Sequence, residues 1–304
     1  MVKDLVQSMR YRSWTKNLLV FGALLFVPGA VMQTEAVTRC VLAFIGFCLL
    51  SGGLYIVNDV TDIKRDRNHP LKKNRPIASG RVPTVTALIF ALFLFLICFA
   101  ISAWIDNSPF EVSSFGKVMH VEYSVTITFF AYFILTILYT TILKRISILD
   151  VIIIAIGFVL RAVSGAAALN VVISPWLLLC TFLLSVYLAL AKRRGELIQL
   201  GKDSVNHRDN LAEYSITDID QFLSITAATN IISYSLYTFI ADNARGSYLM
   251  VTIPMVIFGI FRYQSLVVRK GEGANPEEIL LNDRPLQIDI LLWIIAVVLI
   301  FKFS

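Results

Sequence analysis

The sequence predicts an all-α, polytopic membrane protein with about nine transmembrane helices, and three observations support this. First, 57% of the 304 residues are hydrophobic and only 16% are charged, whereas charged residues make up about 25% of a typical soluble domain. Second, the apolar residues fall into runs of about 17–25, the length that crosses the hydrocarbon core of a bilayer. Third, the basic residues gather in alternate connecting segments. A soluble protein of this length would need a polar surface that this chain does not supply.

Nine apolar runs are long enough to span a membrane, and the segments between them contain no separate soluble domain. The expected spans cover residues 17–33, 39–57, 83–105, 124–143, 147–169, 173–191, 222–241, 247–268 and 287–303. We therefore expect residues 1–304 to form a single transmembrane domain.

The distribution of Lys and Arg tests this map of spans. With the N-terminus in the cytoplasm, the segments on that side carry 21 Lys and Arg residues, and the segments on the opposite side carry 4. Basic residues concentrate in the cytoplasmic loops of membrane proteins, so this bias supports the spans and their orientation. Two of the cytoplasmic loops, 58–82 and 192–221, are expected to be long and charged. The net charge of +6 thus reflects topology, and we expect no nucleic-acid partner.

The most informative segment follows the second expected span and contains Asn58, Asp59, Asp62 and Asp66. If the span continues as a helix, Asn58, Asp62 and Asp66 share one face, and Asp59 borders that face. Like charges at this spacing repel one another, and a bound cation would relieve the repulsion. Mg²⁺ suits such oxygen ligands, and it completes its shell with water and substrate phosphate. The pattern predicts a magnesium site, although a solvated helix end flanked by compensating basic residues explains the same spacing.

Basic residues follow the acidic motif in the same loop, at Lys72, Lys73 and Arg75. Acids that hold a metal, beside bases that hold phosphate oxygens, make a diphosphate site. A cytoplasmic loop is expected to be basic in any case, so topology alone also explains each lysine.

Two further groups of charged residues lie beyond this loop. After the sixth span, Lys192 and Glu196 are spaced i, i+4, and a salt bridge at a helix end explains them adequately. Arg161 lies inside the fifth span, where a charge costs roughly 2.5–3.5 kcal/mol. We therefore expect Arg161 to face an interior cavity or partner. Small residues around it, including Gly157 and Gly165, allow helices to approach closely.

The motif Asn58-Asp59-x-x-Asp62-x-x-x-Asp66 resembles that of the UbiA superfamily of intramembrane prenyltransferases. The nine spans and the segment Arg75-Pro76-Ile77-Ala78-Ser79-Gly80 extend the resemblance over nearly the whole chain. The resemblance implies a bundle of helices around a central cavity, with Mg²⁺ and a diphosphate bound by the acidic motif at the cytoplasmic mouth.

One departure from the superfamily pattern indicates a particular branch. Most members carry a second Asp-rich motif after the sixth span, whereas this chain has Lys192-Arg193-Arg194-Gly195-Glu196. This pattern is similar to the polyprenyl-phosphate (decaprenyl-phosphate) phosphoribosyltransferase branch, which moves phosphoribosyl from phosphoribosyl diphosphate (PRPP) onto a lipid phosphate. The same similarity includes Ser13-Trp14-Thr15-Lys16-Asn17, His69-Pro70, and Leu149-Asp150-Val151 through Arg161. Extra bases also suit substrates that bring more anionic groups, because uncompensated anions repel strongly at low dielectric.

Together, the residues and the resemblance predict an Mg²⁺-dependent pentosyltransferase of the bacterial inner membrane, with its site facing the cytoplasm. It would transfer 5-phosphoribosyl from PRPP to a polyprenyl phosphate, release diphosphate, and supply cell-envelope pentose (arabinan) synthesis. The expected metal ligands are Asn58, Asp62 and Asp66, and Asp59 joins them in the catalytic set. The expected substrate-binding residues are Lys16, Tyr55, Lys72, Lys73, Arg75, Tyr139, Lys144, Arg161, Lys192, Arg193 and Glu196.

Three alternatives remain open at this point. The chain could prenylate an aromatic acceptor, as other members of the superfamily do. A transporter is less favoured, because its charged sites should lie near the midplane of broken helices, whereas these acids cluster at one end of a span. A non-catalytic scaffold has no need for four such residues within nine positions. The sequence leaves the lipid length and the oligomeric state open, with a homo-oligomer among the partners considered.

Overall fold

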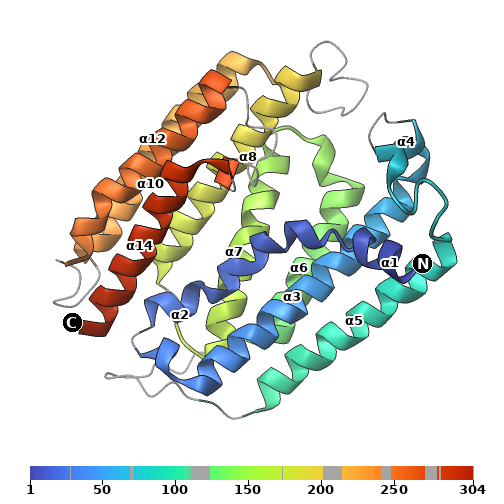
Figure 1. The fold of residues 1–304 in the computed structure, drawn as a ribbon, viewed down its shortest axis with the longest axis horizontal. Helices are drawn as coiled ribbons and strands as arrows, with labels where there is room; N and C mark the ends of the chain where they lie inside the picture. The colour runs from blue at the N-terminus through green and yellow to red at the C-terminus, as the bar shows by residue number, and fades with distance from the viewer. Residues whose placement is uncertain are drawn as a thin grey trace. The chain divides into compact units, whose positions relative to one another are not determined.

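The computed structural model describes residues 1–27, 29–68, 72–108, 110, 124–172, 174–200, 214–240, 248–270, 279–280 and 282–303. Within these ranges the fold is all-α and contains no strand (Figure 1). The all-α class predicted from the sequence is therefore confirmed.

Each of the last eight expected spans corresponds to one long helix. These helices are α3 (Thr34–Thr61), α5 (Thr84–Asn107), α6 (Val125–Thr141), α7 (Leu149–Leu169), α8 (Pro175–Leu200), α10 (Ile216–Ile240), α12 (Ile253–Lys270) and α14 (Arg284–Phe303). Six of the described helices, α3, α5, α7, α8, α12 and α14, are long and apolar enough to cross a membrane. The chain is thus a polytopic membrane protein, and the count of nine spans stays a prediction.

The first expected span, residues 17–33, is not a single helix. The 3₁₀ helix η1 (Tyr11–Phe21) leads into the short helices α2 (Gly22–Phe26) and η2 (Ala30–Met32). Gly29 has a left-handed backbone with φ of +75°, a conformation that glycine adopts without steric cost and that ends a helix. Apolar length alone predicted one span here, because it does not reveal where the backbone changes direction.

The chain divides into two compact units, and each is described by itself. The first contains Met1–Leu24, Ala30–Thr140 and Leu160–Val172, and the second contains Leu25–Gly29, Thr141–Val159 and Ile173–Ser304. The prediction of one transferase domain over residues 1–304 stays a prediction.

In the first unit, α3 packs along α5, and η1 packs against α3 (Figure 1). Phe47, Leu50 and Phe129 are fully buried in its core. Gly165 lies directly against the chain at Val20, because a Cβ atom built on Gly165 would lie 1.9 Å from the Val20 carbonyl oxygen. The close helix approach predicted around Arg161 is therefore realised at Gly165.

A buried arginine also joins three segments of the first unit. Arg39, near the start of α3, donates from Nε to the Ala168 carbonyl and from Nη2 to the Ile105 carbonyl, both at 2.7 Å. Its Nη1 donates to the Ser108 carbonyl at 3.1 Å. These carbonyls lie at the C-terminal ends of α5 and α7, where a cation is favoured by the helix dipole. Arg39 therefore caps two helices at once.

In the second unit, α8, α10, α12 and α14 pack together around buried Tyr187, Leu223 and Tyr263. Helix α8 continues to Leu200, so the expected loop at 192–221 begins at least nine residues late. Lys192 and Glu196 therefore lie on a helix rather than in a loop. Polar residues ended the apolar run in the sequence, but they do not end the helix, because Lys, Arg and Glu are good helix formers.

We expect Gly165→Ala to destabilise the protein by about 3 kcal/mol or more, because the new methyl group would meet backbone that cannot rotate away. Thermal unfolding in detergent, followed by tryptophan fluorescence, measures the effect. Gly22→Ala is the control, since a Cβ atom at Gly22 has no neighbour within 4 Å. We expect that control to keep or slightly raise the Tm, and equal Tm values for both variants would contradict the close contact.

Candidate active site

The acidic motif spans the end of α3 and the short helix α4 (Ile63–Arg67). Helix α3 ends at Thr61, and Asp62 lies between the helices with φ −93° and ψ 8°. Helical hydrogen bonding nevertheless continues, because the Asp62 N–H donates to the Asn58 carbonyl at 2.9 Å and the Asp66 N–H donates to the Asp62 carbonyl at 2.8 Å. The predicted continuous helix is therefore interrupted at Asp62, a residue type that favours helix ends.

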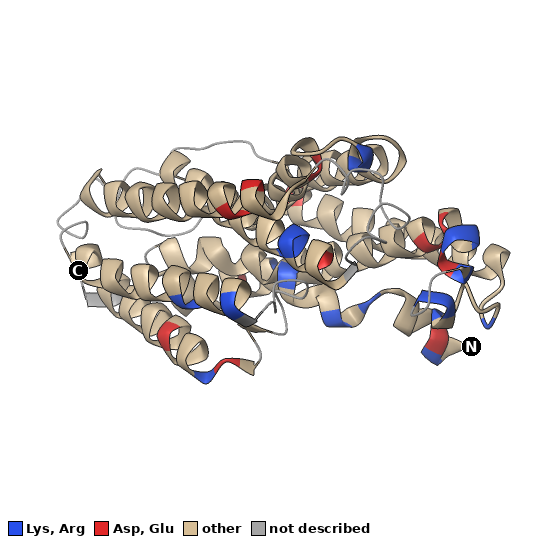
Figure 2. Ribbon diagram, turned by 90° about the horizontal axis from the view of Figure 1, so that it is seen from above, with Lys and Arg blue, Asp and Glu red and all other residues tan. Residues whose placement is uncertain are grey.

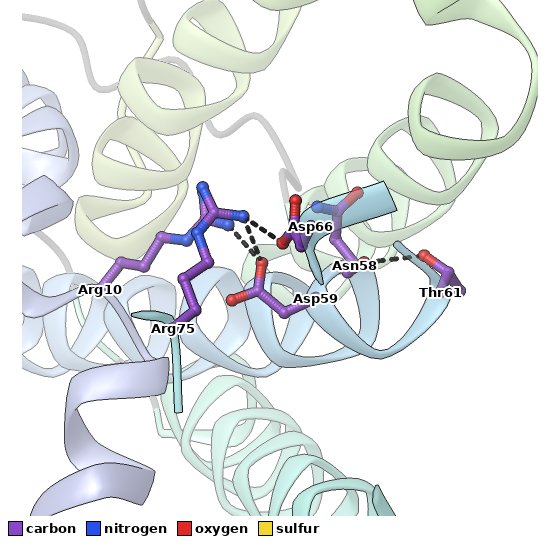
Figure 3. Close-up of polar contacts among 6 residues, drawn as sticks. All are labelled: Arg10, Asn58, Asp59, Thr61, Asp66 and Arg75. Atoms are coloured by element: carbon purple, nitrogen blue, oxygen red, sulfur yellow. Dashed lines mark hydrogen bonds and ion pairs between the residues drawn. The ribbon is translucent and has the colours of Figure 1, made fainter. Parts of the chain in front are cut away.

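Two carboxylates of the motif share one guanidinium (Figure 3). Arg75 Nη1 lies 2.7 Å from Asp66 Oδ2 and 3.2 Å from Asp59 Oδ1. Arg10 Nη2 also donates to Asp59 Oδ1. The side chains of Asp59 and Asp66 are only 3% and 4% exposed. Buried carboxylates are costly unless they are paired, so these arginines neutralise the acids.

A tight turn places Arg75 against the acids. The Arg75 N–H donates to the Lys72 carbonyl at 3.0 Å, closing η3 (Lys72–Asn74), and the Ser79 N–H donates to the Arg75 carbonyl at 2.9 Å. Ile77 and Ala78 are buried below the turn. Gly80 has φ of +79°, which the turn can accommodate because glycine has no Cβ. The segment after the acidic motif thus forms one wall of the site.

The site has a mixed charge. Near the N-terminus, acidic and basic residues alternate around α1 (Val2–Ser8) and the end of α3, whereas the long helices are mostly uncharged (Figure 2). Asn58 and Asp62 are half-buried, and the Asn58 carbonyl accepts from Thr61 Oγ1 at 2.8 Å. Among the described residues, no three His, Cys, Asp or Glu side chains form a group that could hold a metal.

The donor atoms nevertheless fit a magnesium ion. Asp59 and Asp66 both present carboxylate oxygens to the Arg75 guanidinium. Mg²⁺ usually takes one or two carboxylates from the protein. The structure joins Asp59 and Asp66 through Arg75, whereas the sequence grouped Asp66 with Asn58 and Asp62. The three-residue ligand set stays a prediction.

Three predicted phosphate-binding lysines lie in the first unit. Lys72 and Lys73 are exposed on η3, and Lys16 is half-buried on η1. Tyr55 lies beneath Arg10, with the guanidinium carbon 4.7 Å from its ring centroid. Their roles in substrate binding stay predictions.

Other predicted site residues lie elsewhere. Tyr139 is half-buried near the end of α6, and Lys144 is half-buried in η4 (Leu143–Arg145). Tyr139 belongs to the first unit and Lys144 to the second, and their roles in substrate binding stay predictions. His69 and Pro70 lie outside the described residues.

Arg161 has polar and aromatic partners inside the first unit. Its Nε donates to Asn17 Oδ1 at 2.8 Å, and its Nη2 donates to the Tyr132 hydroxyl at 2.7 Å. The guanidinium also lies over the rings of Tyr132 and Phe47, at 4.8 and 5.6 Å from their centroids. Because Arg161 lies inside a span, we expected it to have interior partners, and these contacts provide them. They hold η1 against α6 and α7.

Arg193 and Glu196 form a buried network in the second unit. Arg193 is 1% exposed, and its Nε lies 2.7 Å from Asp150 Oδ2, while its Nη1 lies 2.6 Å from Glu196 Oε2. The Tyr214 hydroxyl donates to Asp150 Oδ1 at 2.9 Å. Burial and the neighbouring Asp150 raise the pKa of the Tyr214 phenol, so it remains protonated. Glu196 pairs with Arg193, whose guanidinium is enclosed by carboxylates, and this favours a structural role. The substrate-binding roles predicted for Arg193 and Glu196 stay predictions.

Lys192, the remaining member of the second predicted group, is half-buried on the same turn of α8. The next residue but one, Arg194, pairs with Asp220 at 2.6 Å and donates to the Val267 carbonyl at 3.0 Å. The basic run after the sixth span therefore contains two arginines that join helices of the second unit.

Sequence reasoning missed Arg10 as a site residue. It assigned Arg10 to membrane topology, because nothing local distinguishes it from Arg12. The pairing with Asp59 joins positions 49 residues apart, and no spacing rule reveals such a contact.

The fold and the site define a membrane-embedded helical protein with a cluster of buried acids and arginines at the end of a long helix. A sequence model described as the UbiA prenyltransferase family matches residues 18–281, and the chain belongs to this family. It is 31% identical to decaprenyl-phosphate phosphoribosyltransferase of Mycolicibacterium smegmatis, over 97% of this chain and 91% of that protein. It is 29% identical to the protein of the same name in Mycobacterium tuberculosis strain H37Rv, over 98% of this chain and 94% of that protein.

The fold agrees with solved structures of the family. A UbiA homolog from Archaeoglobus fulgidus bound to GPP and Mg²⁺ has a TM-score of 0.73 at 16% identity, covering 98% of this chain and 99% of that one. Another structure of a UbiA homolog from that organism, bound to Cd²⁺, has a TM-score of 0.70 at 15% identity, with the same coverage of both chains. These two neighbours show that the chain has the UbiA fold.

We expect Asp150→Asn to lower the unfolding free energy by about 3 kcal/mol, because it leaves the buried Arg193 charge incompletely paired. Asp283→Asn is the control, since it removes the same charge from the Arg262–Asp283 pair, whose guanidinium is 37% exposed and stays hydrated when its partner is lost. Exposed pairs contribute about 1 kcal/mol or less. Denaturant or thermal unfolding in detergent compares the two variants, and an equal loss in both would contradict the importance of burial.

Proposed function

We propose that this protein transfers the 5-phosphoribosyl group from PRPP to a polyprenyl phosphate and releases diphosphate. The observation that carries the proposal is the similarity, over nearly the whole chain, to proteins named decaprenyl-phosphate phosphoribosyltransferase. The basic run from Lys192 to Arg194, where other family members have acids, supports the same branch. The product would serve the synthesis of cell-envelope pentose polymers such as arabinan.

The reaction needs a site that holds a diphosphate and stabilises it as it leaves. Asp59 and Asp66, with Asn58 and Asp62, would hold Mg²⁺, which neutralises the leaving diphosphate. Arg75 lies beside these acids and is placed to bind diphosphate oxygens as charge develops on them. Lys72 and Lys73, exposed on the same turn, add positive charge.

The acceptor needs no general base in this mechanism. The lipid phosphate is already ionised at neutral pH, so its oxygen attacks C1 of the ribose directly. The bond between C1 and the diphosphate oxygen breaks as positive charge spreads over C1 and the ring oxygen, as in other glycosyl transfers. The main task of the protein is therefore to position two anionic substrates and to keep their repulsion small.

The charge distribution supports a site that faces the cytoplasm, and the bacterial relatives support a place in the inner membrane. The acidic motif lies in one of the segments that carry most of the basic residues, and such segments face the cytoplasm. Donor entry from the cytoplasm and lipid entry from the bilayer would then meet at the end of α3.

A second candidate is prenyl transfer to an aromatic acceptor, which the family description and the GPP-bound neighbour favour. Both reactions expel diphosphate from a carbon with cationic character, so one metal-diphosphate site serves either. The donor that the enzyme accepts distinguishes them.

We expect purified protein with Mg²⁺, polyprenyl phosphate and ribose-labelled PRPP to place label in the lipid phase. EDTA should abolish the signal, and Asp62→Asn should lower it by about 100-fold or more, since each removes charge stabilisation of the leaving group. Scintillation counting after solvent extraction measures the transfer, and Asp218→Asn, an exposed acid on α10, is the control.

The outcomes separate the two parts of the proposal. Full activity in a folded Asp62→Asn protein would contradict the role of Asp62. No transfer from PRPP, together with activity on a prenyl diphosphate and an aromatic acceptor, would replace the phosphoribosyl function by prenyl transfer.

A further inference from the structure

A polar hollow of about 340 Å³ adjoins the carboxylate pair in the first unit. Its wall contains Gln7 and Arg10 from the N-terminal segment, Asp59 from α3, and Asn74 and Arg75 from the turn. The volume is near the lower end of the roughly 300–1,000 Å³ typical of small-molecule sites. The hollow shares Asp59 and Arg75 with the proposed diphosphate site, so the two lie next to each other.

The two arginines give this hollow the chemistry of an anion site. A guanidinium has five N–H donors. Arg75 reaches both carboxylates through Nη1, and Arg10 reaches Asp59 through Nη2. Within the described part of the chain, the remaining donors of each guanidinium are therefore available to a ligand. The side-chain amides of Gln7 and Asn74 supply further hydrogen-bonding groups in the wall.

Arg10 is held firmly for this task. Its backbone has φ of +51°, a left-handed conformation that is costly for a residue with a side chain and that often accompanies a functional position. Asp59 fixes one edge of its guanidinium, and the Tyr55 ring lies 4.7 Å from the guanidinium carbon. An arginine restrained in this way loses little further conformational entropy when it binds an anion.

We propose that the hollow binds the 5-phosphate of the donor, while the donor diphosphate lies at Asp59 and Asp66. This inference rests on the proposed function and adds the residue that selects the donor, Arg10. A prenyl diphosphate has no second anionic group, so a site for one distinguishes a phosphoribosyl donor from a prenyl donor. The phosphate of the lipid acceptor has the same chemistry, but Pro76 is the one apolar residue among those that line the hollow, and a polyprenyl chain needs an apolar path.

Binding of ribose 5-phosphate in the presence of EDTA tests the site without metal, diphosphate or turnover. We expect calorimetric titration to show binding to the wild-type protein, and Arg10→Gln to weaken it by roughly 10- to 100-fold, the loss typical of a charge-assisted hydrogen bond. Arg10→Lys should recover part of the affinity. Arg12→Gln is the matched control, because Arg12 lies two residues away, is exposed and does not line the hollow.

A second variant avoids the ion pair with Asp59, in case Arg10→Gln disturbs folding. Gln7→Glu places a negative charge on the wall and should weaken ribose 5-phosphate binding, whereas Lys3→Gln, an equal charge change at an exposed residue of α1, should not. Unchanged binding in both Arg10→Gln and Gln7→Glu, or no binding to the wild type, would overturn the inference. Displacement of ribose 5-phosphate by a short-chain prenyl phosphate would assign the hollow to the acceptor and also overturn it.

A kinetic comparison separates this inference from the proposed function. The wild-type enzyme should prefer PRPP over ribose 1-diphosphate, and Arg10→Gln should lower kcat/KM for PRPP by at least 10-fold more than it lowers kcat/KM for ribose 1-diphosphate. Transfer from PRPP with an unchanged preference in Arg10→Gln would overturn the role of Arg10 alone. Failure of the wild type to use PRPP would instead overturn the proposed function.

Discussion

In a chain with so few polar residues, a buried charge must be paired within the protein, because a bilayer offers no partner for it. This constraint accounts for much of the described architecture. Arg39 caps two helices, Arg161 on α7 binds η1 and α6, and Arg193 joins α7 to α8. Each of these contacts links segments far apart in the sequence. Buried arginines therefore determine how these segments meet.

The same electrostatic arrangement occurs once in each unit but has different consequences. Asp59 and Asp66 share Arg75, and Asp150 and Glu196 share Arg193. Arg193 is almost completely enclosed, whereas Arg75 is 28% exposed and borders a hollow. Exposure therefore decides which cluster can exchange a protein partner for a ligand. In this chain, Arg193 and Arg194 join helices beyond the sixth span, whereas the cluster at the end of α3 borders a hollow.

The sequence predicted what depends on local patterns and missed what depends on distant contacts. Apolar runs located α3 and the seven long helices after it, because their length and hydropathy are local properties. The same criterion failed at η1, whose Asn17 is tied to Arg161, 144 positions away. The acids of the site were found because they lie within nine residues of one another. Arg10 was not found, because its partner is fixed only by the fold, and the break at Asp62 was not found because helical spacing is kept across it.

The hydrogen bonds from Arg39 to the ends of α5 and α7 have a consequence for how the protein enters the membrane. The chain is made from its N-terminus, so α3 reaches the bilayer before the carbonyls of Ile105 and Ala168 exist. Until α5 and α7 follow, the Arg39 charge must stay in the polar headgroup region, since burying it alone is costly. The start of α3 can therefore settle at its final depth only after more than half of the chain has been synthesised. Biogenesis of the first unit is thus coupled to the arrival of α7, and a ribosome that stalls before residue 168 leaves Arg39 with its partners on α5 but without the Ala168 carbonyl.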